Sequence, residues 1–176
     1  PGEALALVRD IAERVPDDER AWINLAVMCQ HGWRDFDAAR AFRRASCLRP
    51  DRLDLVYRDN LLLPAVPRSV TDIADWRWRF RSGINRLRRL PPLLDDPAER
   101  LGPPSFYLAY HDEDDRPLME ALRRMFRSTA PCLTHRAPHL TRWKPPRGGD
   151  RGIRVGFVSE YLSGHTIGKL YQGVLR

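Results

Sequence analysis

One histidine near the end of the chain stands where several kinds of enzyme place a reactive side chain. Residues 153–159, IRVGFVS, are β-branched and mostly apolar, as is typical of a buried strand. Gly164 and Gly168 flank His165 and indicate a turn that needs small residues, and a helix is predicted to begin after Gly168, with Lys169, Leu170 and Val174. Strand, turn and helix in this order open a doubly wound α/β domain. In such domains ligands bind at the carboxyl ends of the strands, where His165 lies.

The chemistry open to this turn follows from its residue types. The imidazole of His165 can accept a proton or form a hydrogen bond with a hydroxyl group. Thr166 and the first backbone N–H groups of the helix can meet an anionic group such as a diphosphate. The alternative interpretation is that His165 only caps the helix.

Three other groups of residues could bind a metal, and each has a simpler explanation. His135 and His139 have the spacing of zinc ligands on a helix, but Pro131 and Pro138 argue against a helix there. The acidic residues 112–115 are better explained as capping groups for the next helix. The three cysteines form no CxxC pair, so we expect small apolar side chains in a reducing compartment. No metal site is predicted.

The first fifty residues contain a repeat with a period of 34. A shift by 34 places Ala4 on Ala38 and Pro16 on Pro50. The second copy matches the tetratricopeptide consensus at Trp22, Leu25, Ala26, Ala38, Phe42, Ala45 and Pro50. Two helices are predicted, with Gly32 supplying conformational freedom in the turn and the acidic residues before Trp22 capping the first helix. The groove of such repeats binds a protein or peptide partner, or the repeats are a spacer. Solenoid repeats depend on their neighbours, so we expect more of them before Pro1.

Helices are also predicted for the middle of the chain. One covers residues 53–63 and is stopped by prolines, and the next, capped by Ser69 or Thr71, covers residues 73–87. The segment WRWRFR (76–81) alternates with period two, so a strand is the local alternative. The arginines of this helix have three interpretations. The simplest is a solvated basic face, and the alternatives are a platform that stacks on single-stranded nucleic acid and a face that docks on an acidic surface within the full protein. A further helix has the apolar stripe Leu118, Leu122, Met125 and Phe126.

Composition narrows the class of protein. The chain has 176 residues, is 43% hydrophobic and 30% charged, and contains no apolar run long enough to span a membrane. No signal peptide is recognised, and the first and last residues fall within running patterns, so we expect a cytoplasmic fragment of a longer protein. The net charge of +7 comes from 28 Arg and only two Lys, a skew that fits codon bias better than nucleic-acid binding.

These pieces occur in one order: tetratricopeptide repeats, then FYLAYH with DRPL after it (106–118), then RVGFVS followed by GHTIG (154–168). This order resembles the O-linked N-acetylglucosamine transferase family, in its bacterial SPINDLY-like branch. The resemblance implies a two-lobed, Rossmann-type (GT-B) fold. On this basis residues 1–50 are tetratricopeptide repeats, 51–103 a helical connector, and 104–176 the incomplete start of the N-terminal catalytic lobe. The fold class is mainly α, with a truncated strand-turn-helix at its end.

The resemblance also implies an inverting protein glycosyltransferase that needs no metal or cofactor. It transfers a sugar from a nucleotide donor, expected to be UDP-N-acetylglucosamine, to Ser or Thr hydroxyls of an acceptor protein held by the repeats. His165 is then the catalytic residue, acting in positioning or proton transfer, and Gly164, Thr166 and Gly168 are the substrate-binding residues. Tyr161 stands where many relatives carry Asp. Most donor contacts in this family lie in a C-terminal lobe, so residues 1–176 alone are expected to be inactive.

Two other hypotheses stay open at this point. The chain could belong to a non-enzymatic tetratricopeptide adaptor whose α/β tail is degenerate. It could also be an Arg-rich nucleic-acid binder, for which affinity would fall steeply with salt.

Overall fold

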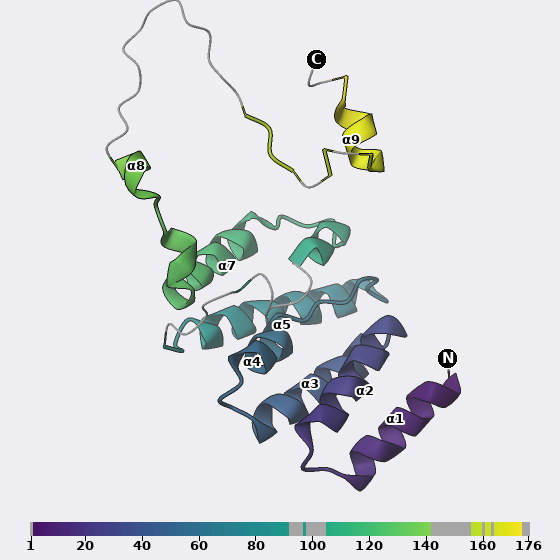
Figure 1. Ribbon diagram of the computed structural model, residues 1–176. Helices are drawn as coiled ribbons and strands as arrows, with labels where there is room; N and C mark the ends of the chain where they lie inside the picture. The colour runs from purple at the N-terminus through teal and green to yellow at the C-terminus, as the bar shows by residue number, and fades with distance from the viewer. Residues whose placement is uncertain are drawn as a thin grey trace, which may run out of the picture. The chain divides into compact units, whose positions relative to one another are not determined.

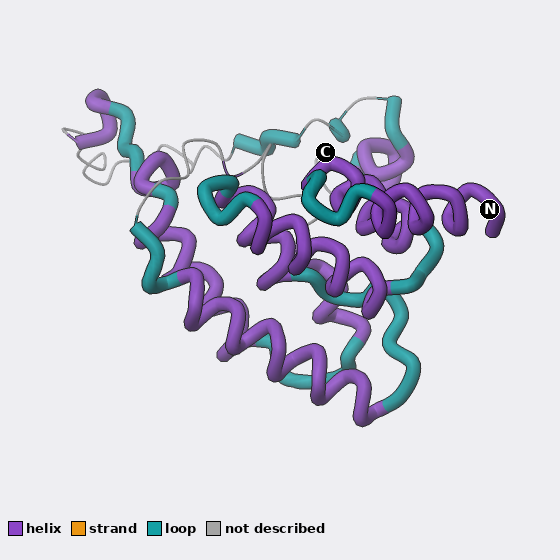
Figure 2. The backbone as a smooth tube through the Cα atoms, turned by 90° about the horizontal axis from the view of Figure 1, so that it is seen from below, coloured by secondary structure: helices purple, strands orange, loops and turns teal. Residues whose placement is uncertain are grey.

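The computed structural model describes residues 2–91, 97, 105–141, 156–159, 161–162 and 164–173. The chain divides into two compact units, Pro1–Arg136 and Ala137–Arg176. The described residues are mainly helical and contain no strand, as Figures 1 and 2 show. The mainly α class is therefore confirmed. None of the helices in the described part of the chain is both long and apolar enough to cross a membrane.

In the first unit most helices pack against the next one along the chain (Figure 1). The elements are α1 (Gly2–Arg14), α2 (Glu19–His31), α3 (Asp35–Leu48), α4 (Leu53–Leu61), α5 (Val70–Leu87), η1 (Ser105–Tyr110), α7 (Arg116–Thr129) and η2 (Pro131–Thr134). This unit combines the predicted repeats, the predicted connector and the first part of the predicted catalytic lobe.

The hairpin of α2 and α3 has the apolar stripes that the repeat predicts. Leu25, Ala26 and Cys29 of α2 are buried, as are Ala38, Phe42 and Ala45 of α3. Small side chains at these positions let the two helices approach closely. The side chain of Asp18 caps α2 by accepting a hydrogen bond of 2.9 Å from the Arg20 N–H.

The turn between these helices differs from the prediction. Gly32 has φ −92°, which any residue adopts, and the next residue, Trp33, takes the left-handed conformation with φ 58°. The predicted use of glycine's conformational freedom at Gly32 is therefore wrong. The chain reverses one residue later, because the Gly32 N–H still bonds to the carbonyls of Met28 and Cys29.

The two helices predicted for the middle of the chain are confirmed as α4 and α5. Ser69 caps α5 through a 3.1 Å hydrogen bond from the Asp72 N–H, and Trp76, Phe80, Ile84 and Leu87 are buried. The local alternative, a strand at residues 76–81, is wrong because the whole segment lies inside α5. Gly83 lies directly against the end of α4, where an added Cβ would be 2.2 Å from the Asn60 carbonyl oxygen.

Two arginines of α5 do not form the predicted solvated face. The Arg77 side chain is 10% exposed and bonds to Asp115 Oδ1 at 2.6 Å and to Glu113 Oε2 at 2.9 Å. The Arg79 guanidinium is 3.0 Å from Asp59 Oδ1. Both side chains thus join α5 to acidic groups of neighbouring segments. The remaining arginines are exposed, as the predicted solvated face requires: Arg81, Arg86, Arg88 and Arg89.

The acidic run before α7 has a different main role from the one predicted. Asp115 occupies the N-cap position, but its side chain makes no capping bond to the helix. The Asp114 side chain accepts a hydrogen bond of 3.0 Å from the Arg116 N–H at the start of the helix. The capping prediction is correct for Asp114 and wrong for Asp115, because the buried guanidinium of Arg77 binds that carboxylate instead.

The second unit contains two short helices, α8 (Pro138–Thr141) and α9 (Thr166–Tyr171). Of the predicted strand at residues 153–159, residues 153–155 lie outside the described part, and residues 156–159 belong to no helix or strand. The predicted helix after the turn is present as α9, and it begins before Gly168 rather than after it. The doubly wound lobe stays a prediction.

Candidate functional site

The side chain of His165 is fixed by the start of α9. His165 is the N-cap residue, with φ −71° and ψ 153°, and its Nδ1 accepts a hydrogen bond of 3.2 Å from the Ile167 N–H. Its carbonyl oxygen accepts the first helical bond, from the Lys169 N–H at 3.1 Å. The residue is exposed to solvent. Capping, the simpler of the two interpretations, is therefore what the ring does here, and one ring nitrogen is left for other partners.

This hydrogen bond selects one tautomer of the ring. A neutral imidazole carries its proton on one nitrogen only, and Nδ1 is the acceptor here. The proton is therefore on Nε2, and the neutral ring offers a donor on that side. In this geometry His165 is suited to holding a substrate oxygen in place by donating a hydrogen bond. Taking up a proton would require the ring to release the Ile167 N–H.

The predicted substrate-binding residues share the turn with His165 but are not equivalent. Gly164 precedes the ring, and an added Cβ there would meet no atom within 4 Å, so packing among the described residues does not require glycine. Thr166 is the first residue of α9 and is exposed. Gly168 lies inside the helix rather than in the turn.

Tyr161 adds a second ring to the same turn. Its ring centroid lies 4.6 Å from that of His165, with the planes tilted by 40°. The Tyr161 N–H bonds to Ser159 Oγ at 3.1 Å, which fixes the backbone where the extended segment ends. Tyr161 has no predicted role of its own from the sequence, where it only replaces the Asp of many relatives. The structure instead gives it a ring contact with the imidazole.

The predicted anion site at the start of α9 has fewer free donors than expected. The Ile167 N–H, one of the first N–H groups of the helix, is already bonded to the imidazole. A diphosphate at this place would use the remaining N–H groups and the Thr166 hydroxyl. Binding of an anionic donor here stays a prediction.

The histidines at positions 135 and 139 do not share a helix, as the prediction from the prolines has it. Pro131 and Pro138 each begin a short helix, η2 and α8, because proline is tolerated at the first helical position. His135 ends η2 while His139 belongs to α8, so one continuous helix does not carry both. Among the described residues no group of three or more possible metal ligands is present.

A buried histidine that the sequence did not reveal lies beside the Arg77 ion pairs. His111 is 3% exposed, and neither ring nitrogen has a hydrogen-bond partner within the described residues. Burial, and then the positive charge of Arg77, hold the pKa of His111 below its usual value. The ring is therefore neutral at pH 7, buried and close to the Arg77 guanidinium. No sequence signal marks it, because its environment comes from distant segments.

A basic groove on α7 was also missed. Met119, Arg123, Phe126 and Arg127 lie on one side of this helix and line a groove together with residues 133–136. Only the spacing of Met119, Arg123 and Arg127, at i, i+4 and i+8, could have indicated it.

Comparison of the chain with protein-family models, with curated proteins and with solved structures found no match.

Proposed function

We propose that this chain is part of a cytoplasmic protein O-glycosyltransferase, in which the helical repeats hold an acceptor protein and the His165 turn orients its hydroxyl group. The observation that carries the proposal is the exposed imidazole, fixed through Nδ1 at the start of α9. A helical hairpin with tetratricopeptide spacing earlier in the chain supports it. The order of these parts is the order of the family that the sequence resembles.

The proposed reaction joins a Ser or Thr oxygen to a sugar. The hydroxyl oxygen attacks the anomeric carbon of the nucleotide sugar, and the bond from that carbon to the diphosphate breaks. The nucleoside diphosphate leaves with the bonding electrons, and the hydroxyl proton passes to a phosphate oxygen of this leaving group. His165 donates a hydrogen bond from Nε2 to the reacting oxygen and so holds it in line. UDP-N-acetylglucosamine is the proposed donor, and its main binding residues belong to a lobe outside residues 1–176.

The test is transfer of labelled sugar by the full-length protein. His165→Ala is expected to lower kcat/KM by about two orders of magnitude, as losing one positioned hydrogen-bond donor does in other enzymes. His165→Gln keeps an N–H donor near the place of Nε2 and is expected to retain clearly more activity than His165→Ala. His165→Asn can keep the capping bond to Ile167 but cannot reach the substrate, so it is the matched control for helix capping.

The outcomes separate the possible roles of the ring. Equal loss in the Gln and Ala variants would exclude donation by Nε2 and favour proton transfer. Unchanged kcat/KM in all three variants would reduce His165 to a helix cap and refute the assignment of the site. Residues 1–176 alone are expected to show no transfer with any nucleotide sugar.

The second candidate function is a non-enzymatic helical-repeat adaptor. The apolar side chains of Leu7 and Ile11 on α1, and of Val15 directly after this helix, favour it, because they are 60%, 45% and 43% exposed and recur every four residues. Such a stripe is the kind of surface that another helix covers. Sugar transfer by the full-length protein with any nucleotide sugar would exclude a purely adaptor function.

A further inference from the structure

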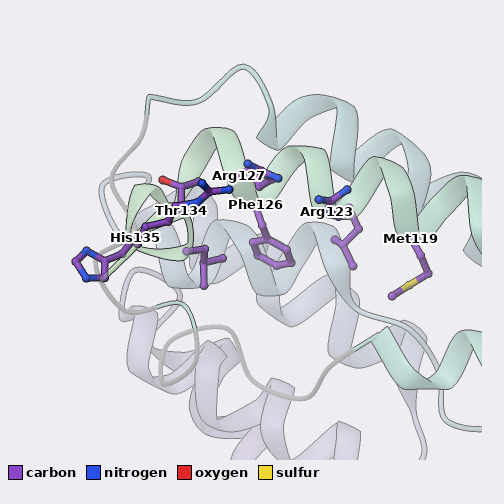
Figure 3. Close-up of a pocket in the computed structure, with 9 residues that line it drawn as sticks. Met119, Arg123, Phe126, Arg127, Thr134 and His135 are labelled. Atoms are coloured by element: carbon purple, nitrogen blue, oxygen red, sulfur yellow. The ribbon is translucent and has the colours of Figure 1, made fainter. Parts of the chain in front are cut away.

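An open groove of about 630 Å³ follows one face of α7 and continues onto η2 (Figure 3). Its apolar lining comes from Met119, Leu122 and Phe126 of α7 and from Leu133 of η2. Met119 is 43% exposed and Leu133 is 55% exposed. The groove lies within the first unit, so its shape depends only on helices that pack against one another.

Among the residues that the structure describes, the charges lining this groove all have the same sign. Arg123, Arg127 and Arg136 contribute to the lining and all three are exposed, and none of the described lining residues is acidic. In the part of the chain that the structure describes, none of the three forms an ion pair or a hydrogen bond. By contrast, Arg116 and Arg124 on another side of α7 both pair with Glu120, at 2.9 and 3.8 Å. The groove side of the helix is thus left with unneutralised positive charge.

The shape of the groove fits a rod-like ligand. Met119, Leu122 and Phe126 have the spacing i, i+3 and i+7, so the apolar floor extends about 10 Å along α7 before η2 continues it. Figure 3 shows the labelled side chains spread in a row from Met119 to His135. An amphipathic helix places its own apolar residues at the same intervals and can lie along such a row.

A nucleic acid fits this groove less well. Sequence-tolerant binding of single strands relies on aromatic rings that stack on the bases. Phe126 contributes a phenyl ring to the described lining, and this ring is stacked on Tyr57 with a centroid distance of 6.3 Å. The positive charge would attract a nucleic acid, but the floor is suited to aliphatic side chains.

We propose that the groove of α7 and η2 binds an acidic amphipathic helix of a partner protein. Leucine-like side chains of the partner cover Met119, Phe126 and Leu133, and its Glu or Asp side chains pair with Arg123 and Arg127. This docking site is independent of the glycosyltransferase proposal, because it uses no residue of the His165 turn.

The test measures fluorescence anisotropy of a labelled peptide on addition of the 176-residue chain. The probe is a peptide of about 18 residues, long enough to form a helix, with leucines at i, i+3, i+4 and i+7 and glutamates elsewhere. One comparison peptide has lysine in place of every glutamate, and another has the same composition with the leucines dispersed. The first peptide is expected to bind in the micromolar range, and both comparison peptides at least about tenfold more weakly.

Two double variants give the matched comparison. Arg123→Glu with Arg127→Glu reverses two charges at the groove and is expected to weaken binding about tenfold or more. Arg40→Glu with Arg81→Glu makes the same change in net charge at exposed positions within α3 and α5, and binding is expected to stay within about twofold. Leu133→Ser removes apolar floor from an exposed position and should weaken binding without changing the unfolding midpoint.

Several results would overturn the proposal. Equal affinity for the glutamate and dispersed-leucine peptides would leave only attraction between net charges, and equal weakening by the two double variants would show the same. Binding of a single-stranded oligonucleotide that Leu133→Ser does not affect, in the absence of peptide binding, would assign the groove to nucleic acid. Dimerisation in sedimentation velocity that excludes the peptide would make a second copy the occupant.

Discussion

The contact between Gly83 and Asn60 allows one substitution to report on how closely α4 and α5 pack. A Cβ added at Gly83 would lie 2.2 Å from the carbonyl oxygen of Asn60 and 2.9 Å from its carbonyl carbon. Both are backbone atoms, so no side-chain rotation can relieve the overlap. Ordinary contact begins at 3.4 Å, and Gly83→Ala therefore requires α5 to move by about 1 Å.

The energetic cost follows from two opposing effects. Overpacking of this kind costs about 3 kcal/mol where the obstacle is rigid. Alanine is better than glycine inside a helix by about 1 kcal/mol, which offsets part of the cost. We therefore expect Gly83→Ala to lower the free energy of unfolding by about 2 kcal/mol. The buried side chains beside it, Phe80 and Ile84, would lose contacts in the same movement.

Urea unfolding followed by circular dichroism measures this change. Asn85→Ala is the matched control, because Asn85 is exposed on the same helix and its substitution should stabilise the helix by about 0.5 kcal/mol. The thermal midpoint should fall by roughly 4–8 °C for Gly83→Ala and rise slightly for the control. If Gly83→Ala were at least as stable as the unmodified chain, the close approach of α4 and α5 would be refuted.

Two further predictions concern buried polar groups. Folding holds the pKa of His111 below about 6.5, its value in unfolded chains, so the unfolded state binds more protons as the pH falls past about 6.5. We therefore expect the free energy of unfolding to decrease below about pH 6.5. His111→Leu should make this decrease smaller, which urea titrations at several pH values would measure. An unchanged pH profile in His111→Leu would show that other groups cause the loss. Arg79→Met leaves the carboxylate of Asp59, which is 4% exposed, without its closest cation and should lower the free energy of unfolding by about 3 kcal/mol. Adding Asp59→Asn should recover much of that loss, which a double-mutant cycle would measure. Strictly additive effects would mean that the two side chains do not interact.

The candidate site could be predicted from the sequence only in part. The motif around His165 and the start of a helix beside it follow from local residue types, and the structure contains both. The hydrogen bond from the Ile167 N–H to Nδ1, which determines the tautomer, could not be predicted because it depends on the ring's rotamer and the φ and ψ of the cap. The groove on α7 was missed for a similar reason, since Leu133 and Arg136 join it only through the fold of η2.

Helices themselves were largely determined by the sequence. The stripe from Trp76 to Leu87 and the cap at Ser69 are features of a few adjacent residues, and helix formation responds to such local periodicity. Only the tertiary structure decided that Arg77 pairs with Asp115, 38 positions along the chain, and that Gly83 touches Asn60. These contacts depend on which helices pack together and at what depth. Which helices pack together depends on how well their whole surfaces fit, and the spacing of residues within one helix does not predict that fit.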